Sequence, residues 1–186
     1  VCDTIHMANF QFNDFYDEEH LEDMLAMYYR PERINVFMCS EVEVEGFGPA
    51  GGFASMPGGR DYMVLTKSSI NAFSNVWAHE MGHFFGLFHT FESDFGDELV
   101  NASNCTTAGD LICDTSANPT DDSEDFEFIP EVSCNYIGNP AADTNGDFYI
   151  PPSDNIMSYT PCGCRFTPGQ YNRMLEQYVQ NRSYLW

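Results

Sequence analysis

The most informative stretch of this sequence is Trp77-Ala-His-Glu-Met-Gly-His-Phe-Phe-Gly-Leu-Phe-His89. Residues four apart share one face of an α-helix, so His79 and His83 can present their imidazoles to a single ion. Gly86 can adopt the left-handed conformation that ends a helix, after which the chain can turn and bring His89 to the same ion. Three imidazoles leave one position of a tetrahedral zinc ion open, which is typical of a catalytic zinc site rather than a structural one.

Glu80 follows the first histidine directly, so its carboxylate can reach a water molecule on the metal rather than the metal itself. A bare H-E-x-x-H pattern can arise by chance from ordinary surface or core histidines. The additional glycine and histidine at fixed spacing make a chance match far less frequent, and three of the five histidines lie in this motif. We therefore predict zinc bound by His79, His83 and His89, with Glu80 as general base.

A second motif follows in the C-terminal half of the chain. Asp154-Asn-Ile-Met-Ser-Tyr159 fits the methionine turn (Met-turn) that accompanies the extended zinc pattern, with Met157 as the methionine. An isolated methionine is more often core filler, but after the zinc motif the turn is the better interpretation. On these two motifs the chain resembles the metzincin metalloendopeptidases. Its His-Thr-Phe after the third histidine, Gly109-Asp-x-x-x-Asp-Thr115 loop and Asn-x-Met-x-Tyr turn are similar to the pappalysin branch, which includes cytophagalysin-like and ulilysin-type secreted bacterial enzymes.

The resemblance implies an α+β fold, a metzincin-like zinc protease domain over residues 1–186. Residues 1–89 would hold a twisted mixed sheet and two helices, the second carrying the zinc ligands and ending at Gly86. Residues 90–186 would be irregular and tied by disulfides, with the Met-turn and a final helix. The implied activity is zinc-dependent hydrolysis of polypeptides by a secreted endopeptidase, which we expect to be a monomer released from an N-terminal pro-segment.

Two residues of the Met-turn have roles that the resemblance implies. Tyr159 occupies the position where several metzincins use a tyrosine to steady the tetrahedral intermediate, although a buried structural tyrosine is the competing interpretation. Met157 would lie beneath the metal without touching it. Relatives that prefer Arg or Lys after the scissile bond carry an acid shortly after this tyrosine. Here the segment Thr160-Pro-Cys-Gly-Cys164 has no carboxylate and Arg165 is basic, so we predict no strictly basic preference on the primed side.

Two loops invite calcium, which takes oxygen ligands. Asp110 and Thr115 match a loop that binds calcium in pappalysin-like relatives. Asp143, Asn145 and Asp147 place oxygens at alternating positions, as calcium loops do, but Phe148 stands where an EF-hand-like loop has glycine. The alternative for both loops is a turn closed by Asp or Asn side chains.

Composition limits the possible partners. Seven Lys and Arg against 29 Asp and Glu give a net charge of −22, which argues against nucleic acid and anionic membranes. No apolar run is long enough to span a bilayer. Seven cysteines, five of them from Cys105 to Cys164, indicate disulfides and an oxidising compartment. We expect two bridges in the C-terminal half that tie the Met-turn region to the loops before it, with the odd cysteine free or paired outside the chain.

Periodicity and turn residues predict the regular elements. The predicted strands are Thr4–Phe12, Ile34–Val44, Gly52–Met56 and Tyr62–Thr66. The resemblance implies that Gly52–Met56 is an edge strand at the rim of the substrate cleft, and the alternative is a plain surface loop. A helix with the apolar stripe Leu21, Met24, Leu25 and Tyr28 should end at Pro31. The zinc-ligand helix should start between Asn71 and Ser74 and be buried through Phe73, Val76, Trp77, Phe84 and Phe85. A C-terminal helix capped by Thr167, Pro168 and Gln170 should bury Met174, Leu175, Tyr178 and Val179.

Two other classes of function remain possible on sequence alone. One is a binding or adhesion module that keeps the fold but is catalytically inactive; the intact histidines and Glu80 argue against it. The other is a zinc hydrolase of a different bond, such as an amidase. The glycine-rich segment before Tyr62, which suits an extended cleft, favours a polypeptide substrate.

Overall fold

The computed structural model describes residues 18–44, 48–71, 74–118, 134–135, 141–160 and 162–185. The predicted strand Thr4–Phe12 and the side chain of Phe73 lie outside these residues. In chain order the elements are α1 (Glu18–Tyr28), β1 (Asn35–Cys39), β2 (Glu43–Val44), β3 (Gly48–Pro49), β4 (Gly52–Ala54), β5 (Tyr62–Thr66), the 3₁₀ turn η1 (Lys67–Ser69), α2 (Val76–Phe84), α3 (Pro168–Gln177) and the π-helical turn η3 (Tyr178–Arg182).

A mixed three-stranded sheet with the order β1-β5-β4 organises the N-terminal half, as predicted. β1 runs parallel to β5 and β4 runs antiparallel to it, so β4 is an edge strand of this sheet. The predicted single strand Ile34–Val44 is wrong. The backbone leaves the sheet after Cys39, and Val42 turns into the core with 2% of its surface exposed, while β2 pairs with β3 in a separate ribbon.

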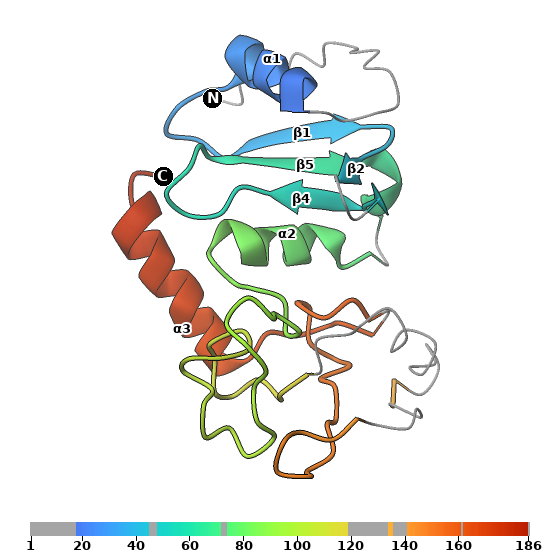
Figure 1. Cartoon of the computed structure of the whole chain (residues 1–186). Coiled ribbons are helices and arrows are strands. Elements are labelled where there is room, and N and C mark those ends of the chain that lie inside the picture. Colours follow the sequence, from blue (N-terminus) through green and yellow to red (C-terminus); the bar gives the residue numbers. More distant parts are fainter. Residues whose placement is uncertain are drawn as a thin grey trace.

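The apolar core of this half lies between α1 and the sheet. Leu21 and Leu25 of α1, two members of the predicted stripe, form a buried cluster with Val42 and Val64. β5 is buried on both faces, since Met63, Val64 and Leu65 are each at most 2% exposed. Figure 1 shows α1 at one side of the sheet and α2 next to β4, with the loops of the C-terminal half beyond α2.

The zinc-ligand helix α2 is shorter than predicted. It starts at Val76, and the preceding Asn75 makes no capping bond through its side chain. Trp77 is 45% exposed, so its predicted burial is wrong: it lies in the first turn, whereas the buried residues of the helix lie from His79 onward. Gly86 follows the helix with φ +83°, the left-handed conformation expected of it.

Helix α3 begins with the predicted capping box, in which the side chains of Thr167 and Gln170 each accept a bond from the other's backbone N–H. Its predicted apolar face is wrong for Leu175 and Val179, which are 60% and 58% exposed, whereas Met174 and Tyr178 are half-buried. The fully buried residues are instead Gln170 and, in η3, Arg182. The inward face of this helix therefore combines buried hydrogen-bonding groups with the apolar contacts of Met174 and Tyr178.

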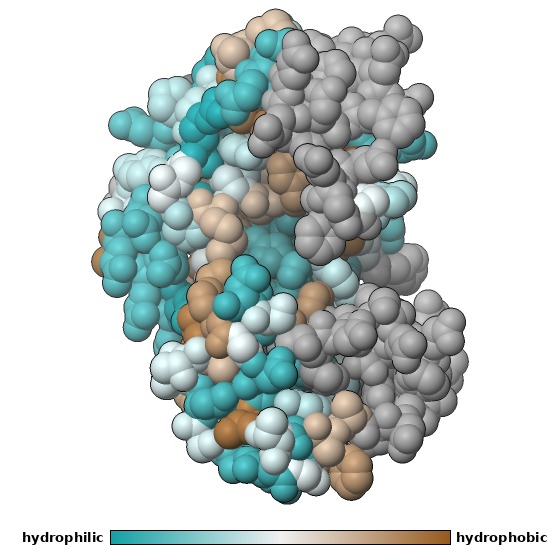
Figure 2. All heavy atoms as spheres, viewed as in Figure 1, coloured by the Kyte–Doolittle hydropathy of each residue, from teal (hydrophilic) through white to brown (hydrophobic). Residues whose placement is uncertain are grey.

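Two disulfides fasten the irregular half. Cys134–Cys162 ties the end of the Met-turn region to an earlier loop, as predicted. Cys105–Cys113 instead closes a short loop of its own, so the expectation that both bridges reach the Met-turn is wrong. Cys39 and Cys164 are free thiols among the described residues. Most of the described face in Figure 2 is hydrophilic, and no helix among the described residues could cross a membrane.

Candidate active site

Three histidine side chains converge at the junction of the two halves. His79 and His83 come from α2, and His89 follows the turn at Gly86. Their Nε2 atoms lie 3.1 Å (His79 to His83), 3.0 Å (His83 to His89) and 3.2 Å (His79 to His89) apart. Nitrogens bound at about 2.0–2.1 Å to one tetrahedral zinc ion would be about 3.3 Å apart, so the three atoms fit a zinc site. They form the only such His, Cys, Asp or Glu cluster found among the described residues.

Backbone carbonyls fix the orientation of two of the rings. The Nδ1 of His79 lies 2.7 Å from the Ile156 oxygen, and the Nδ1 of His83 lies 2.8 Å from the Leu87 oxygen. When each Nδ1–H donates to its carbonyl, the Nε2 lone pair is left for a metal. Burial lowers the pKa of His79, and burial together with His79 lowers the pKa of His83 to about 4. The imidazoles are therefore neutral near pH 7, as metal ligation requires.

Close packing around glycines brings the zinc-ligand helix and the Met-turn together. A Cβ at Gly82 would lie 2.4 Å from the sulfur of Met157, which is fully buried beneath the helix. The turn at Gly86 is closed by a bond from the Leu87 amide to the Gly82 carbonyl. Thr90, next to His89, donates its backbone N–H to the Met157 carbonyl.

Glu80 is 4% exposed and lies between the helix and the edge strand. Its Cγ packs where a Cβ at Gly52 of β4 would lie, at 3.3 Å. Its Oε2 has no hydrogen-bond partner among the described residues, and burial raises the pKa of this carboxyl to about 8. A buried carboxylate with a raised pKa next to a metal-ligand set is suited to accept and return a proton.

Tyr159 is 45% exposed, so it is not the buried structural tyrosine of the competing interpretation. Its ring lies 4.7 Å from the ring of His89 and 5.6 Å from that of His79, measured between centroids. The tyrosine thus borders the histidine cluster on its solvent side. Met157 lies on the opposite side, against α2.

The first predicted calcium loop contains a buried carboxylate pair. Asp110 is 1% exposed; its Oδ1 accepts from the Ile112 amide and from the Thr115 hydroxyl at 2.9 Å. Glu98 is 2% exposed. Within the part of the chain that the structure describes, Oδ2 of Asp110 and Oε1 of Glu98 have no hydrogen-bond partner. Burial is the main cause that raises the pKa of Asp110 to about 6 and of Glu98 to about 7. Sequence reasoning missed Glu98, since no spacing rule links it to Asp110.

The second predicted calcium loop is closed by backbone amides. Oδ1 of Asp143 accepts from the amides of Asn145 and Asp147, and Oδ2 accepts from the Val100 amide. Asn145 and Asp147 are exposed. This is the Asp-closed turn of the alternative interpretation, and calcium at this loop stays a prediction.

The segment after Tyr159 lies against the start of the zinc-ligand helix. The Asn75 side chain donates to the Gly163 carbonyl at 3.2 Å, and a Cβ at Gly163 would clash with it. Arg165 forms an exposed ion pair with Asp154. The carboxylate of Asp154, which opens the Met-turn motif, is therefore already paired with a cation of this chain.

The sheet, the helix-borne histidine pair and the Met-turn beneath it define the class of protein: an α+β fold of the metzincin type. Residues 22–179 match the family Peptidase_M43, described as pregnancy-associated plasma protein-A, and the chain belongs to this pappalysin family. An extracellular metalloprotease of Pyricularia oryzae is 30% identical over 148 residues, which cover 77% of this chain and 41% of the relative. Human pappalysin-1 is 28% identical over 158 residues, which cover 76% of this chain and 9% of the relative.

The fold also matches a solved structure, Tannerella forsythia mature mirolysin in complex with a cleaved peptide. The TM-score is 0.59 at 18% identity, and the match covers 93% of this chain and 65% of mirolysin. This likeness shows the fold. The chain spans less than half the length of the fungal and mammalian relatives named above.

Proposed function

We propose that this chain is a zinc-dependent endopeptidase unit with its working groups at the junction of residues 1–89 and 90–186. The observation that carries the proposal is the convergence of three Nε2 atoms within 3.2 Å, with the orphaned carboxylate of Glu80 beside the first ligand. His79, His83 and His89 would hold the ion. When bound, zinc polarises a peptide carbonyl and lowers the pKa of a water molecule towards about 7.

The residues of the chain carry the remaining steps. Glu80 accepts a proton from the attacking water and passes it to the nitrogen of the leaving amine. Tyr159, on the solvent side of the histidines, donates its hydroxyl to the carbonyl oxygen as negative charge develops there. β4 pairs with β5 on one side only among the described strands, so an extended peptide can add to its other edge. Gly52 keeps that strand close to Glu80.

We also propose that the primed-side preference is not strictly basic. The carboxylate at the start of the Met-turn motif, Asp154, is paired with Arg165, which leaves less negative charge for a substrate Lys or Arg. Secretion is proposed because the fungal relatives are named extracellular and disulfides persist in oxidising compartments. A monomeric state and an N-terminal pro-segment stay predictions.

The deciding experiment measures cleavage of casein by the zinc-loaded chain, its loss on chelation, and its recovery with zinc. Glu80→Gln should bind zinc but lose at least about 100-fold in kcat/KM, the usual contribution of a general base. Tyr159→Phe should lower kcat with an unchanged melting temperature. Glu176→Gln makes the same change at an exposed carboxylate on α3 and should keep full activity.

Near-full turnover by Glu80→Gln would reject the mechanism. Zinc binding by the wild-type chain without any cleavage would instead point to an inactive module with the same fold. A cleavage profile dominated by Arg and Lys after the scissile bond would reject the specificity proposal alone.

We propose calcium at the first loop, bound by Asp110, Thr115 and Glu98. The support is the pair of buried carboxylate oxygens that have no partner among the residues described, because buried carboxylates need a compensating charge. Calcium at 100 times its dissociation constant should stabilise the fold by about 2.7 kcal/mol, or about 5–10 °C in Tm. Asp110→Asn should abolish this shift, measured against EGTA, whereas Asp143→Asn should keep it. The opposite pattern would move the ion to the second loop.

A further inference from the structure

A buried pair of amide side chains connects the C-terminal helix to the Met-turn. The Nδ2 of Asn155 donates to the Oε1 of Gln170 at 2.9 Å, and the Nε2 of Gln170 donates back to the Oδ1 of Asn155 at 3.1 Å. Asn155 is 1% exposed and Gln170 is fully buried. Each side-chain amide thus donates one hydrogen bond to the other and accepts one from it. In this buried position a polar atom without a partner would lower the stability of the fold.

The pair holds the shape of the Met-turn. The Oδ1 of Asn155 also accepts the backbone N–H of Met157 at 2.8 Å, which closes the turn around Ile156. The Ile156 N–H donates to the Arg165 carbonyl at 3.0 Å. The backbone N–H groups before and after the Ile156 carbonyl, those of Ile156 and Met157, are therefore both hydrogen-bonded, which fixes the position of this carbonyl. The same carbonyl oxygen lies 2.7 Å from the Nδ1 of His79.

We propose that Gln170 is a positioning residue for the metal site, and this rests on the function proposed above. Through Asn155 it fixes the Ile156 carbonyl, and that carbonyl sets the tautomer and orientation of His79. The Met-turn and α2 cannot shift much relative to each other, because Met157 packs where a Cβ of Gly82 would lie. Groups that orient a metal-ligating histidine change metal affinity about 10–100-fold when removed.

Gln170 also belongs to the capping box of α3. Its Oε1 serves both roles, because it also accepts the Asn155 Nδ2–H, whereas its Nε2 serves the amide pair alone. The cap uses its Oε1, which accepts the Thr167 backbone N–H at 2.8 Å. The Nε2 donates to Asn155. Gln170→Glu keeps the capping oxygen and turns the donor into a second acceptor that faces the Oδ1 of Asn155. Thr167→Ala does the reverse. It removes the capping hydroxyl, which accepts the backbone N–H of Gln170, and leaves the side-chain amide pair of Asn155 and Gln170 in place.

The test compares these two full-length variants with the wild type by chelator competition for zinc. Gln170→Glu should raise the zinc dissociation constant about 10–100-fold. Thr167→Ala should lower the melting temperature and keep the dissociation constant within about threefold, because a lost cap affects the helix rather than the ligand. Equal affinities for Gln170→Glu and wild type would overturn the proposal. If Gln170→Glu does not fold, Gln170→Met, which introduces no charge, replaces it.

A second readout needs no zinc. In the metal-free chain, the ¹⁵N NMR signal of His79 should report one tautomer with a slowly exchanging Nδ1–H in wild type and Thr167→Ala, and a mixture in Gln170→Glu. An unchanged signal in Gln170→Glu would overturn the inference. If wild type binds no zinc while the His79 signal still responds to Gln170→Glu, the proposed function fails and the coupling of Gln170 to His79 is supported.

Discussion

The regions on either side of the histidine cluster are stabilised in different ways. In residues 18–89 the backbone pairs in a sheet, and the most buried side chains are mainly apolar, such as Leu25, Met63, Val64 and Phe84. From residue 90 onward, the described chain forms only isolated bridges before α3. Its buried polar and charged side chains are Thr90, Glu98, Asp110, Thr115, Asn118, Asp143, Asn155, Ser158, Thr167, Gln170 and Arg182.

The difference teaches that one histidine cluster can be held by two kinds of framework. The first region supplies two of the histidines from a helix on a sheet, where regular backbone bonds set their spacing. The second supplies the Met-turn, whose shape depends on side-chain bonds and disulfides. Substitution of a single side chain should therefore destabilise the second region more, because no repeating backbone pattern replaces the lost hydrogen bonds there.

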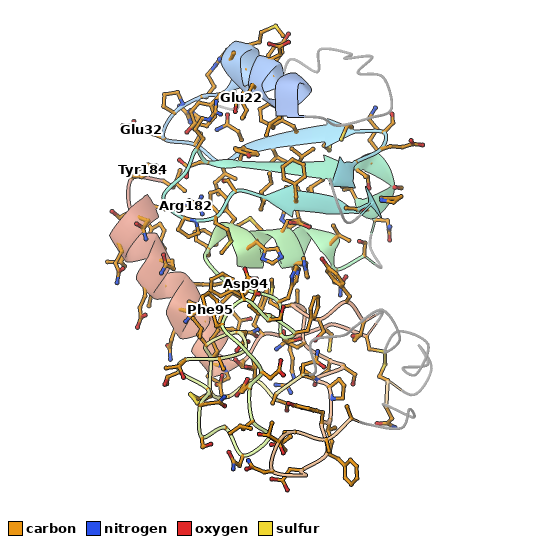
Figure 3. The ribbon with its side chains drawn as sticks, viewed as in Figure 1. Glu22, Glu32, Asp94, Phe95, Arg182 and Tyr184 are labelled. Atoms are coloured by element: carbon orange, nitrogen blue, oxygen red, sulfur yellow. A yellow bond between two sulfur atoms is a disulfide. The ribbon has the colours of Figure 1, made fainter. Side chains whose placement is uncertain are left out.

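The strongest test removes the ion pair that joins the regions. Arg182 donates to Asp61 at 2.8 Å, with both side chains at most 2% exposed, and its guanidinium lies 3.5 Å from the centre of the Phe84 ring. Figure 3 shows Arg182 and Tyr184 where the end of the C-terminal helix approaches the sheet. Arg182→Met leaves the Asp61 charge buried without its partner, so urea unfolding should show a loss of about 3–5 kcal/mol.

The matched control is Arg165→Met, which removes the exposed pair with Asp154 and should leave the free energy of unfolding unchanged. If both variants lose the same small amount, the junction is not held by Arg182.

The next test compares the two disulfides of the irregular region. Cys134–Cys162 spans 28 residues and Cys105–Cys113 spans 8. Removing a disulfide increases the entropy of the unfolded chain, and the increase is larger for a longer loop. Paired Cys→Ser substitutions should therefore lower the free energy of unfolding by about 3.5 kcal/mol for the first bridge and about 2.5 kcal/mol for the second. Thermal unfolding of the two double variants measures the difference. A larger loss from Cys105–Cys113 would show that strain or bound ions, rather than loop length, control this region.

The smallest effect concerns Tyr184, whose hydroxyl donates to Asp61 at 2.7 Å. This bond, followed by burial, raises the pKa of Tyr184 to about 12. The folded chain therefore keeps a proton that the unfolded chain loses from about pH 10, so the stabilisation is complete below pH 10 and disappears as the pH rises towards 12. Because the side chain is 42% exposed, Tyr184→Phe should cost only about 1 kcal/mol at pH 7.

The measurement is the free energy of unfolding of Tyr184→Phe and wild type between pH 7 and 12. The two curves should converge as the pH rises. Tyr171→Phe, on the exposed side of α3, serves as the control. A constant gap between wild type and Tyr184→Phe at all pH values would contradict this account.

The sequence predicted those features that depend on spacing. The convergence of the three histidines, the turn at Gly86, the Met-turn, β5 and the capping box at Thr167 follow from short patterns with a fixed geometry. The predicted burial of Leu175 and Val179 failed because periodicity assumes a wide apolar stripe, whereas the inward face here is narrower and mixed, with Met174 and Tyr178 beside Gln170 and Arg182. Glu98 and the Asn155–Gln170 pair could not be predicted, since side-chain networks between distant loops leave no periodic trace.

The close approach at Gly82 has a consequence for the motif itself. In the pattern H-E-x-x-H the two x positions accept any residue. In this chain the first is the half-buried Met81. The second is Gly82, which leaves room for the sulfur of the fully buried Met157. A methyl group at Gly82 would push α2 and the Met-turn apart. The pattern H-E-x-x-H therefore omits a requirement for glycine that this structure imposes.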